Sequence, residues 1–153
     1  MTPLPPDFSE FLRLLNENEV RYLLIGGHAV GFHGHVRGTG DIDVWVDIKG
    51  DNPERMVKAL GEFGFRGPGV SAELFREPDQ IVRMGVPPLR IEVMTSISGV
   101  DFDESYQSRL IANWGGPDVS IISLPMLRKN KRASARLKDL EDLKHLEGKK
   151  DRE

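Results

Sequence analysis

The stretch LLIGGHAVGFHGHVRGTGDIDVWVD, residues 23–47, carries the strongest structural pattern in this chain. An apolar run at 22–25 stops at a pair of glycines, which predicts a short buried strand. A short helix is expected at 28–32. Residues 41–48 then alternate between β-branched side chains and acidic or aromatic ones, the period of two that is typical of a strand with two unlike faces. The stretch therefore predicts a strand, a short helix and a second strand.

Outward from this stretch, helical and strand patterns alternate along the chain. Apolar spacing and capping residues predict helices, and β-branched runs beside Gly or Pro predict strands. Helices are expected from Asp7 to about residue 15, at 52–63, 101–107, 124–132 and 136–146, and strands at 81–85, 89–94, 109–113 and 119–122. Residues 65–80 show no clear period, although Gly67, Pro68 and Gly69 indicate a loop. Antiparallel hairpins mixed with helices indicate an α+β fold. We expect one domain over 1–153, with a core at about 7–146 and a frayed tail at 147–153.

Composition excludes several classes of protein. The 153 residues include no cysteine, which rules out disulfides and thiolate chemistry. No apolar stretch approaches the roughly 20 residues that span a bilayer, and no secretory signal is visible. We therefore expect a cytoplasmic protein with no membrane partner. The net charge is −3, but residues 128–138 form a local basic cluster that is able to contact phosphates.

Two carboxylates carry the chemistry that the pattern suggests. Asp41 and Asp43 are two residues apart on a predicted strand, so their side chains face the same way. Such a pair is either the solvent-facing side of a strand or a site where a divalent cation removes the repulsion. Mg²⁺ prefers oxygen ligands of this kind. A third acid, Glu92, lies in the predicted strand 89–94 and makes the cation site more specific.

The arrangement of these motifs resembles a known family. Residues 23–47 are similar to the signature of the DNA polymerase β-like nucleotidyltransferase superfamily. More narrowly, they resemble its minimal nucleotidyltransferase branch, similar to the abortive-infection type IV toxin nucleotidyltransferases. RIEVMTSISGVDFDESY (90–106) and KRASARLKDLEDLKHL (131–146) resemble later segments of that branch. The resemblance implies a mixed sheet with flanking helices and a short C-terminal helical segment.

The resemblance also implies a metal site. Asp41 and Asp43 would bind two Mg²⁺ (or Mn²⁺) ions. Glu92 would complete the coordination of the second ion and would orient or deprotonate the attacking hydroxyl. These three acids are thus the expected catalytic residues.

For the nucleotide, the resemblance implies contacts from two parts of the chain. Gly26 and Gly27 would hold the β- and γ-phosphates of a nucleoside triphosphate such as ATP. Arg37 would neutralise phosphate or brace the acidic strand. Lys131 and Arg132 would reach the triphosphate from the C-terminal segment.

Several side chains near these motifs also have ordinary structural interpretations. Trp45 is expected to pack under a helix, and Arg90 to pair with an acid. Lys138, Asp139 and Asp142 fit ion pairs on a helix surface, while the resemblance leaves Lys138 open as a phosphate contact.

The function implied is transfer of a nucleoside monophosphate to a protein or RNA hydroxyl, within a toxin–antitoxin system. A partner protein that supplies the acceptor site is part of this expectation. A second possibility is a nucleotide-binding or antitoxin-like module that has lost transfer, because Gly40 and Glu92 depart from the family pattern. A third is a metal-dependent phosphohydrolase.

Overall fold

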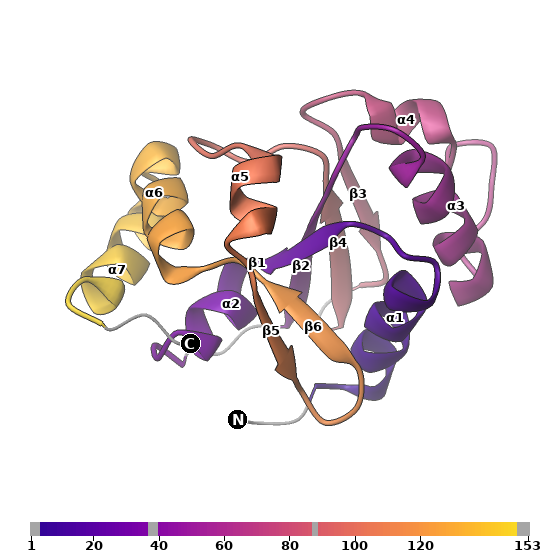
Figure 1. Cartoon of the computed structure of the whole chain (residues 1–153). Helices are drawn as coiled ribbons and strands as arrows, with labels where there is room; N and C mark the ends of the chain where they lie inside the picture. Colours follow the sequence, from indigo (N-terminus) through magenta and orange to yellow (C-terminus); the bar gives the residue numbers. More distant parts are fainter. Residues whose placement is uncertain (1–3, 37–39, 87–88, 150–153) are drawn as a thin grey trace.

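The computed structural model describes residues 4–36, 40–86 and 89–149 (Figure 1). In chain order the helices and strands are α1 (Pro6–Glu17), β1 (Tyr22–Ile25), α2 (Gly26–Phe32), β2 (Asp41–Val46), α3 (Asn52–Phe63), α4 (Ala72–Arg76), β3 (Ile81–Met84), β4 (Arg90–Met94), α5 (Phe102–Gln107), β5 (Leu110–Asn113), β6 (Asp118–Ile121), α6 (Leu124–Ser134) and α7 (Leu137–Leu146).

All six strands belong to one mixed sheet in the order β3-β4-β2-β1-β6-β5. β1 pairs antiparallel with β2 and parallel with β6, and β2 pairs parallel with β4. The hairpins β3–β4 and β5–β6 form the two ends of the sheet. This mixed topology confirms the expected α+β class.

Helices cover both faces of the sheet. Figure 1 shows α1, α3 and α4 on one side, with α2, α5, α6 and α7 on the other. On the first side, the rings of Phe11 and Phe63 meet edge to face at 5.4 Å. On the second side, Trp45 packs edge to face on Phe102 of α5 at 5.0 Å, as the sequence predicts. The alternation along β2 thus sends Val44 toward α1 and α3, and its acidic face toward α5–α7.

The structure fills in residues 65–80, where the sequence pattern predicts only a loop at 67–69. A short helix, α4, follows that loop, because the Ser71 side chain accepts a hydrogen bond from the Leu74 N–H and caps the first turn. Phe75 then reaches the core and is completely buried. Five residues are too few for a periodic pattern to stand out from the surrounding loop.

Two boundaries near the site also differ from expectation. The glycines that were predicted to precede the short helix are its first two residues. The predicted strand 41–48 ends at Val46. The side chain of Asp47, the next residue, is buried and forms an ion pair with the partly exposed Arg21 at 2.8 Å. The Asp47 carbonyl oxygen also accepts a hydrogen bond from the Asn52 side chain at 2.7 Å.

The described residues contain no helix that is long and apolar enough to cross a membrane.

Candidate active site

Charged residues gather on one face of the two parallel central strands. In the register of β2 and β4, Asp43 lies opposite Glu92, and Asp41 lies opposite Arg90. Neighbouring strands are about 4.8 Å apart, and paired residues point to the same face. The sheet therefore brings together the three acids that the sequence analysis selected, although Glu92 is about 50 residues from Asp41 and Asp43 in the chain.

Asp43 is the carboxylate whose environment is least favourable to its charge. Burial, followed by repulsion from Glu92 and Asp41, raises its pKa to about 6. Its Oδ1 atom is buried and has no hydrogen-bond partner among the described residues. Such a group gains strongly from a nearby cation or donor, because it loses solvation without compensation.

Gly26 makes the close approach to Asp43 possible. It has φ of +69°, a conformation that L side chains rarely adopt. A Cβ atom here would lie 2.9 Å from Asp43 Cγ and would overlap Oδ2. The register explains this crowding, since Ile25 pairs directly with Asp43. Gly26 is therefore required by the carboxylate beside it as well as by its own backbone.

Arginines neutralise the other two acids. Arg90 Nη2 donates to Asp41 Oδ2 at 2.9 Å and lies 3.1 Å from Glu92 Oε1. Arg83 Nε reaches the same Glu92 oxygen at 3.2 Å from β3. The hydrogen bond to Asp41 raises the pKa of Arg90, so the guanidinium stays charged. The prediction that Arg90 pairs with an acid is confirmed.

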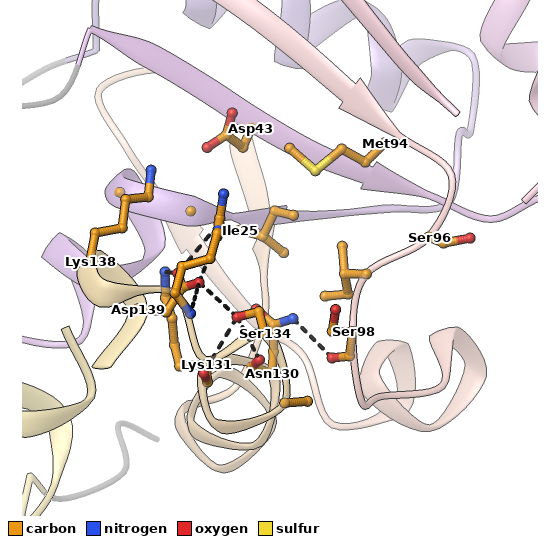
Figure 2. Close-up of a pocket in the computed structure, with 15 residues that line it drawn as sticks. Ile25, Asp43, Met94, Ser96, Ser98, Asn130, Lys131, Ser134, Lys138 and Asp139 are labelled. Atoms are coloured by element: carbon orange, nitrogen blue, oxygen red, sulfur yellow. Dashed lines mark hydrogen bonds and ion pairs between the residues drawn. The ribbon is translucent and has the colours of Figure 1, made fainter. Parts of the chain in front are cut away.

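A cavity of about 360 Å³ opens beside Asp43, between the sheet and the C-terminal helices (Figure 2). Four segments line it: Asp43 of β2, the end of β1 with the start of α2, the end of β4 with the segment that follows it, and the α6–α7 junction. The lining residues are Ile25, Gly26, Gly27, Asp43, Met94, Ser96, Ile97, Ser98, Asn130, Lys131, Ala133, Ser134, Arg136, Lys138 and Asp139. Gly99 holds the segment after β4 close to α6, because a Cβ there would overlap Ala133 Cβ. The cavity thus joins the acidic strand to the basic segment 131–138.

A buried ion cluster holds the α6–α7 junction in place. Lys131 Nζ lies 3.1 Å from both Asp139 Oδ1 and Asp142 Oδ2, and all three side chains are buried. Burial opposes ionisation of Asp139, but hydrogen bonds from Arg136, Lys131 and Ser134 outweigh it and keep its pKa well below the usual range. The expectation of surface ion pairs at Asp139 and Asp142 is therefore wrong.

We expect Lys131→Met to destabilise the protein by about 3–5 kcal/mol, because two buried carboxylates lose their shared cation. Urea unfolding followed by circular dichroism measures this change. Lys129→Met, on the exposed side of the same helix, is the control and should stay within about 0.5 kcal/mol of the wild type. Adding Asp142→Leu to Lys131→Met should recover part of the loss. If Lys131→Met unfolded at the same urea concentration as the wild type, the stabilising role of this ion cluster would be contradicted.

The residues predicted to contact the nucleotide do not all line the cavity. Gly26 and Gly27 line the cavity. Lys131 also lines it, but its ammonium is bound by the two buried aspartates. Arg132 pairs with Glu147 at 3.0 Å and is not among the residues that line the cavity. Arg37 lies outside the described residues.

Lys138 and Arg136 are basic residues that line the cavity in addition to the predicted nucleotide contacts. The charge of Lys138 acts favourably on Asp43 across the space. Figure 2 shows the Lys138 side chain extending on the same side of the cavity as Asp43. The polar residues Ser96, Ser98 and Asn130 were not selected from the sequence, because nothing in their local pattern distinguishes them from ordinary loop and helix residues.

The donor set suits a hard cation in part. Carboxylate oxygens are the ligands that Mg²⁺ and Mn²⁺ take, and Asp43 offers one that no described residue satisfies. As the side chains stand, however, the described residues include no group of three or more His, Asp or Glu arranged to hold a metal. Arg90 Nη2 instead contacts two of the acids, Asp41 and Glu92.

Comparison with solved structures identifies the fold. The chain is similar to an antigenic nucleotidyltransferase-like protein from Paracoccidioides brasiliensis, with a TM-score of 0.53 and 17% identity over 95% of this chain and 78% of that one. It is also similar to a putative nucleotidyltransferase from Thermotoga maritima, with a TM-score of 0.56 and 13% identity over 91% and 87%. No family model and no curated protein matches the sequence. The fold is therefore nucleotidyltransferase-like, as the sequence motifs predict.

Proposed function

We propose that this protein is a metal-dependent nucleotidyltransferase that moves a nucleoside monophosphate from a nucleoside triphosphate to a hydroxyl of a protein or RNA. The observation that carries the proposal is Asp43, a buried carboxylate with an unsatisfied oxygen at the edge of a cavity that basic side chains also line. An acid and cations facing one space suit a metal-bound triphosphate better than a neutral ligand. The fold shared with two nucleotidyltransferase-like proteins supports this reading.

In this proposal, different residues around the cavity contact the phosphates and the metal ion. The backbone of Gly26 and Gly27 borders it without side chains in the way, which leaves room for phosphate oxygens. Lys138 and Arg136 would supply positive charge from the α6–α7 junction. Asp43 and Asp41 would hold Mg²⁺ (or Mn²⁺), which when bound offsets the charge that develops on the phosphate oxygens.

Glu92, which lies opposite Asp43 in the strand register, would orient the acceptor hydroxyl. The hydroxyl oxygen forms a new bond to the α-phosphorus as the bond to the β-phosphate bridge breaks. Pyrophosphate leaves, and the hydroxyl proton passes to Glu92 or to water. The protein acts chiefly by positioning these groups, which is the general pattern of phosphoryl chemistry.

A direct test is transfer of label from each α-labelled nucleoside triphosphate into fractions of native-cell lysate, with Mg²⁺ or Mn²⁺. The Asp41→Ala/Asp43→Ala double variant runs in parallel. Label that enters protein or RNA only with the wild type supports the proposal and identifies the acceptor class. Equal labelling by both proteins would rule it out.

The resemblance to abortive-infection type IV proteins supports a place for this activity in a toxin–antitoxin pair. In that setting a partner protein supplies or blocks the acceptor site. Purification of the chain alone, with full activity and no bound partner, from cells that express it natively would argue against this part of the proposal.

A second candidate function is a nucleotide-binding module without transfer. It is favoured by the arginine contacts of Asp41 and Glu92, which occupy two of the three acids. Metal-dependent nucleotide binding, with no label transferred to any lysate fraction, would select this candidate.

We expect Lys138→Ala to weaken binding of the Mg²⁺–triphosphate complex roughly tenfold, because one charge-assisted contact is worth about 1.4 kcal/mol or more. The melting temperature should not change, since Lys138 is exposed. Calorimetric titration with a non-hydrolysable ATP analogue measures the affinity.

Lys144→Ala is the matched control for Lys138→Ala, because Lys144 is an exposed lysine of the same helix. It is not among the residues that line the cavity and should bind the analogue as the wild type does. Equal affinities for all three proteins would remove Lys138 from the site.

A further inference from the structure

Arg90 occupies the position between two acids of the site. It lies opposite Asp41 in the β2–β4 register, and its side chain points to the same face of the sheet. One nitrogen, Nη2, contacts both Asp41 Oδ2 at 2.9 Å and Glu92 Oε1 at 3.1 Å. A single positive group thus bridges the carboxylates of two neighbouring strands, which is the task that a divalent cation would otherwise perform.

The contact is built into the sheet and does not depend on a mobile surface side chain. Arg90 is the first residue of β4, and its backbone N–H donates to the Gly40 carbonyl at 3.3 Å. Its side chain is 31% exposed, and Nε is completely buried. A guanidinium keeps its charge at any physiological pH, so no protonation change releases the two acids.

Asp43 contrasts with its two neighbours. Its Oδ1 atom finds no partner among the described residues, whereas Asp41 and Glu92 each have an arginine. The positive charge in the site is therefore distributed unevenly. One carboxylate still needs a cation, and the other two already share one.

We propose that Arg90 takes the place of a second divalent cation, so that this chain binds one Mg²⁺ or Mn²⁺ ion, at Asp43. The inference rests on the proposed function, which places a metal-bound triphosphate at this edge of the sheet. Three ionised carboxylates beside two guanidinium groups, those of Arg90 and Arg83, leave one negative charge. A single divalent cation is enough to offset that charge. A second cation would face the Arg90 charge at contact distance and would have to displace it from both acids.

The test counts bound ions and looks for coupling between them. Mn²⁺ is titrated into the full chain, alone and with an ATP analogue that carries a methylene between the α- and β-phosphorus. Electron paramagnetic resonance reports the free ion, and two bound ions about 3.5–4 Å apart give a spin-coupled spectrum. The wild type should give the spectrum of isolated ions, whereas Arg90→Met should bind one further Mn²⁺ per chain and show the coupled pair.

Two variants serve as controls for this count. Arg90→Lys keeps a positive charge between the acids and should not show the coupled pair. Arg83→Met removes the other arginine that contacts Glu92 but leaves Arg90 in place, and it should also behave as the wild type. Circular dichroism and the melting temperature establish that each variant is folded.

Each outcome has a distinct meaning. A coupled pair in the wild type overturns the inference and leaves the proposed transfer reaction intact. A folded Arg90→Met that lacks the coupled pair also overturns the inference. No Mn²⁺ bound by any folded variant, with or without the analogue, overturns the proposed function together with the inference.

Discussion

Gly26→Ala should abolish nucleotide transfer, with a loss of at least about 100-fold, because a carboxylate displaced by about 1 Å costs that much in rate. The new Cβ would lie 2.9 Å from Asp43 Cγ and would overlap Oδ2, so the Asp43 side chain must rotate away. The left-handed backbone, with φ of +69°, adds strain. Together these effects should cost about 2–4 kcal/mol of stability. Single-turnover transfer and urea unfolding measure the two losses.

A control separates the backbone strain of Gly26→Ala from the collision. Gly64 has φ of +98° with no atom close to where a Cβ would stand, so Gly64→Ala should cost only about 1–2 kcal/mol. The cost of Gly26→Ala should fall to the same value in an Asp43→Ala background, because the colliding carboxylate is gone. If Gly26→Ala lowered the free energy of unfolding equally with and without the Asp43 carboxylate, Asp43 would not be in steric contact with position 26.

Asp43→Asn should stop the reaction while making the metal-free protein more stable. Loss of the charge that would hold the cation should lower transfer by at least about 100- to 1,000-fold, the scale seen when one essential electrostatic contact is removed. In EDTA at pH 8, the free energy of unfolding should rise by up to roughly 3 kcal/mol, since about two pKa units separate the folded from the unfolded carboxyl.

The sign of this effect follows from the direction of the pKa shift. The folded pKa of Asp43 is raised to about 6 from an ordinary value of 3.8, so the folded state holds its proton over a range where the unfolded state has lost it. Wild-type stability attributable to this group is therefore full below about pH 4 and is lost as pH rises to about 6. The advantage of Asp43→Asn should be present at pH 8 and absent near pH 4.

Asp41→Asn is the matched control for this pH dependence. Its carboxylate accepts a hydrogen bond from Arg90, and its replacement removes a favourable contact. It should therefore show no gain in stability at pH 8. If the free energy of unfolding of Asp43→Asn equalled that of the wild type at every pH, Asp43 would not be a carboxyl with a raised pKa.

Local pattern was enough to predict the acidic half of the site. The alternation along 41–46 places Asp41 and Asp43 on one face regardless of what surrounds the strand, because successive side chains of a strand point to opposite sides. The same period puts Glu92 opposite Ile91 and Val93. The pairing of Arg90 with an acid followed from charge alone, but which acids it contacts depended on the β2–β4 register.

Local pattern was misleading for the basic half of the site, residues 131–142. Lys138 and Asp142 are four residues apart on a helix, the spacing of ordinary surface ion pairs. In the structure, Asp139 and Asp142 instead contact Lys131, on the preceding helix and beyond the α6–α7 junction. Nothing in the spacing of 131–142 reveals that this helix face is buried, because burial depends on how α6 and α7 pack on each other.

From the amino-acid sequence one can derive the order of strands and helices around residues 22–47 and the shared face of Asp41 and Asp43. Both properties depend on backbone geometry within a few residues. The packed core was needed to establish that Glu92 stands beside Asp43, that Arg90 bridges Asp41 and Glu92, that Asp43 leaves no room for a Cβ at Gly26, and that Lys138 rather than Arg132 lines the cavity beside Asp43. The physical reason is that strand register and helix packing are set by burial of the whole core, which joins residues that no local period connects.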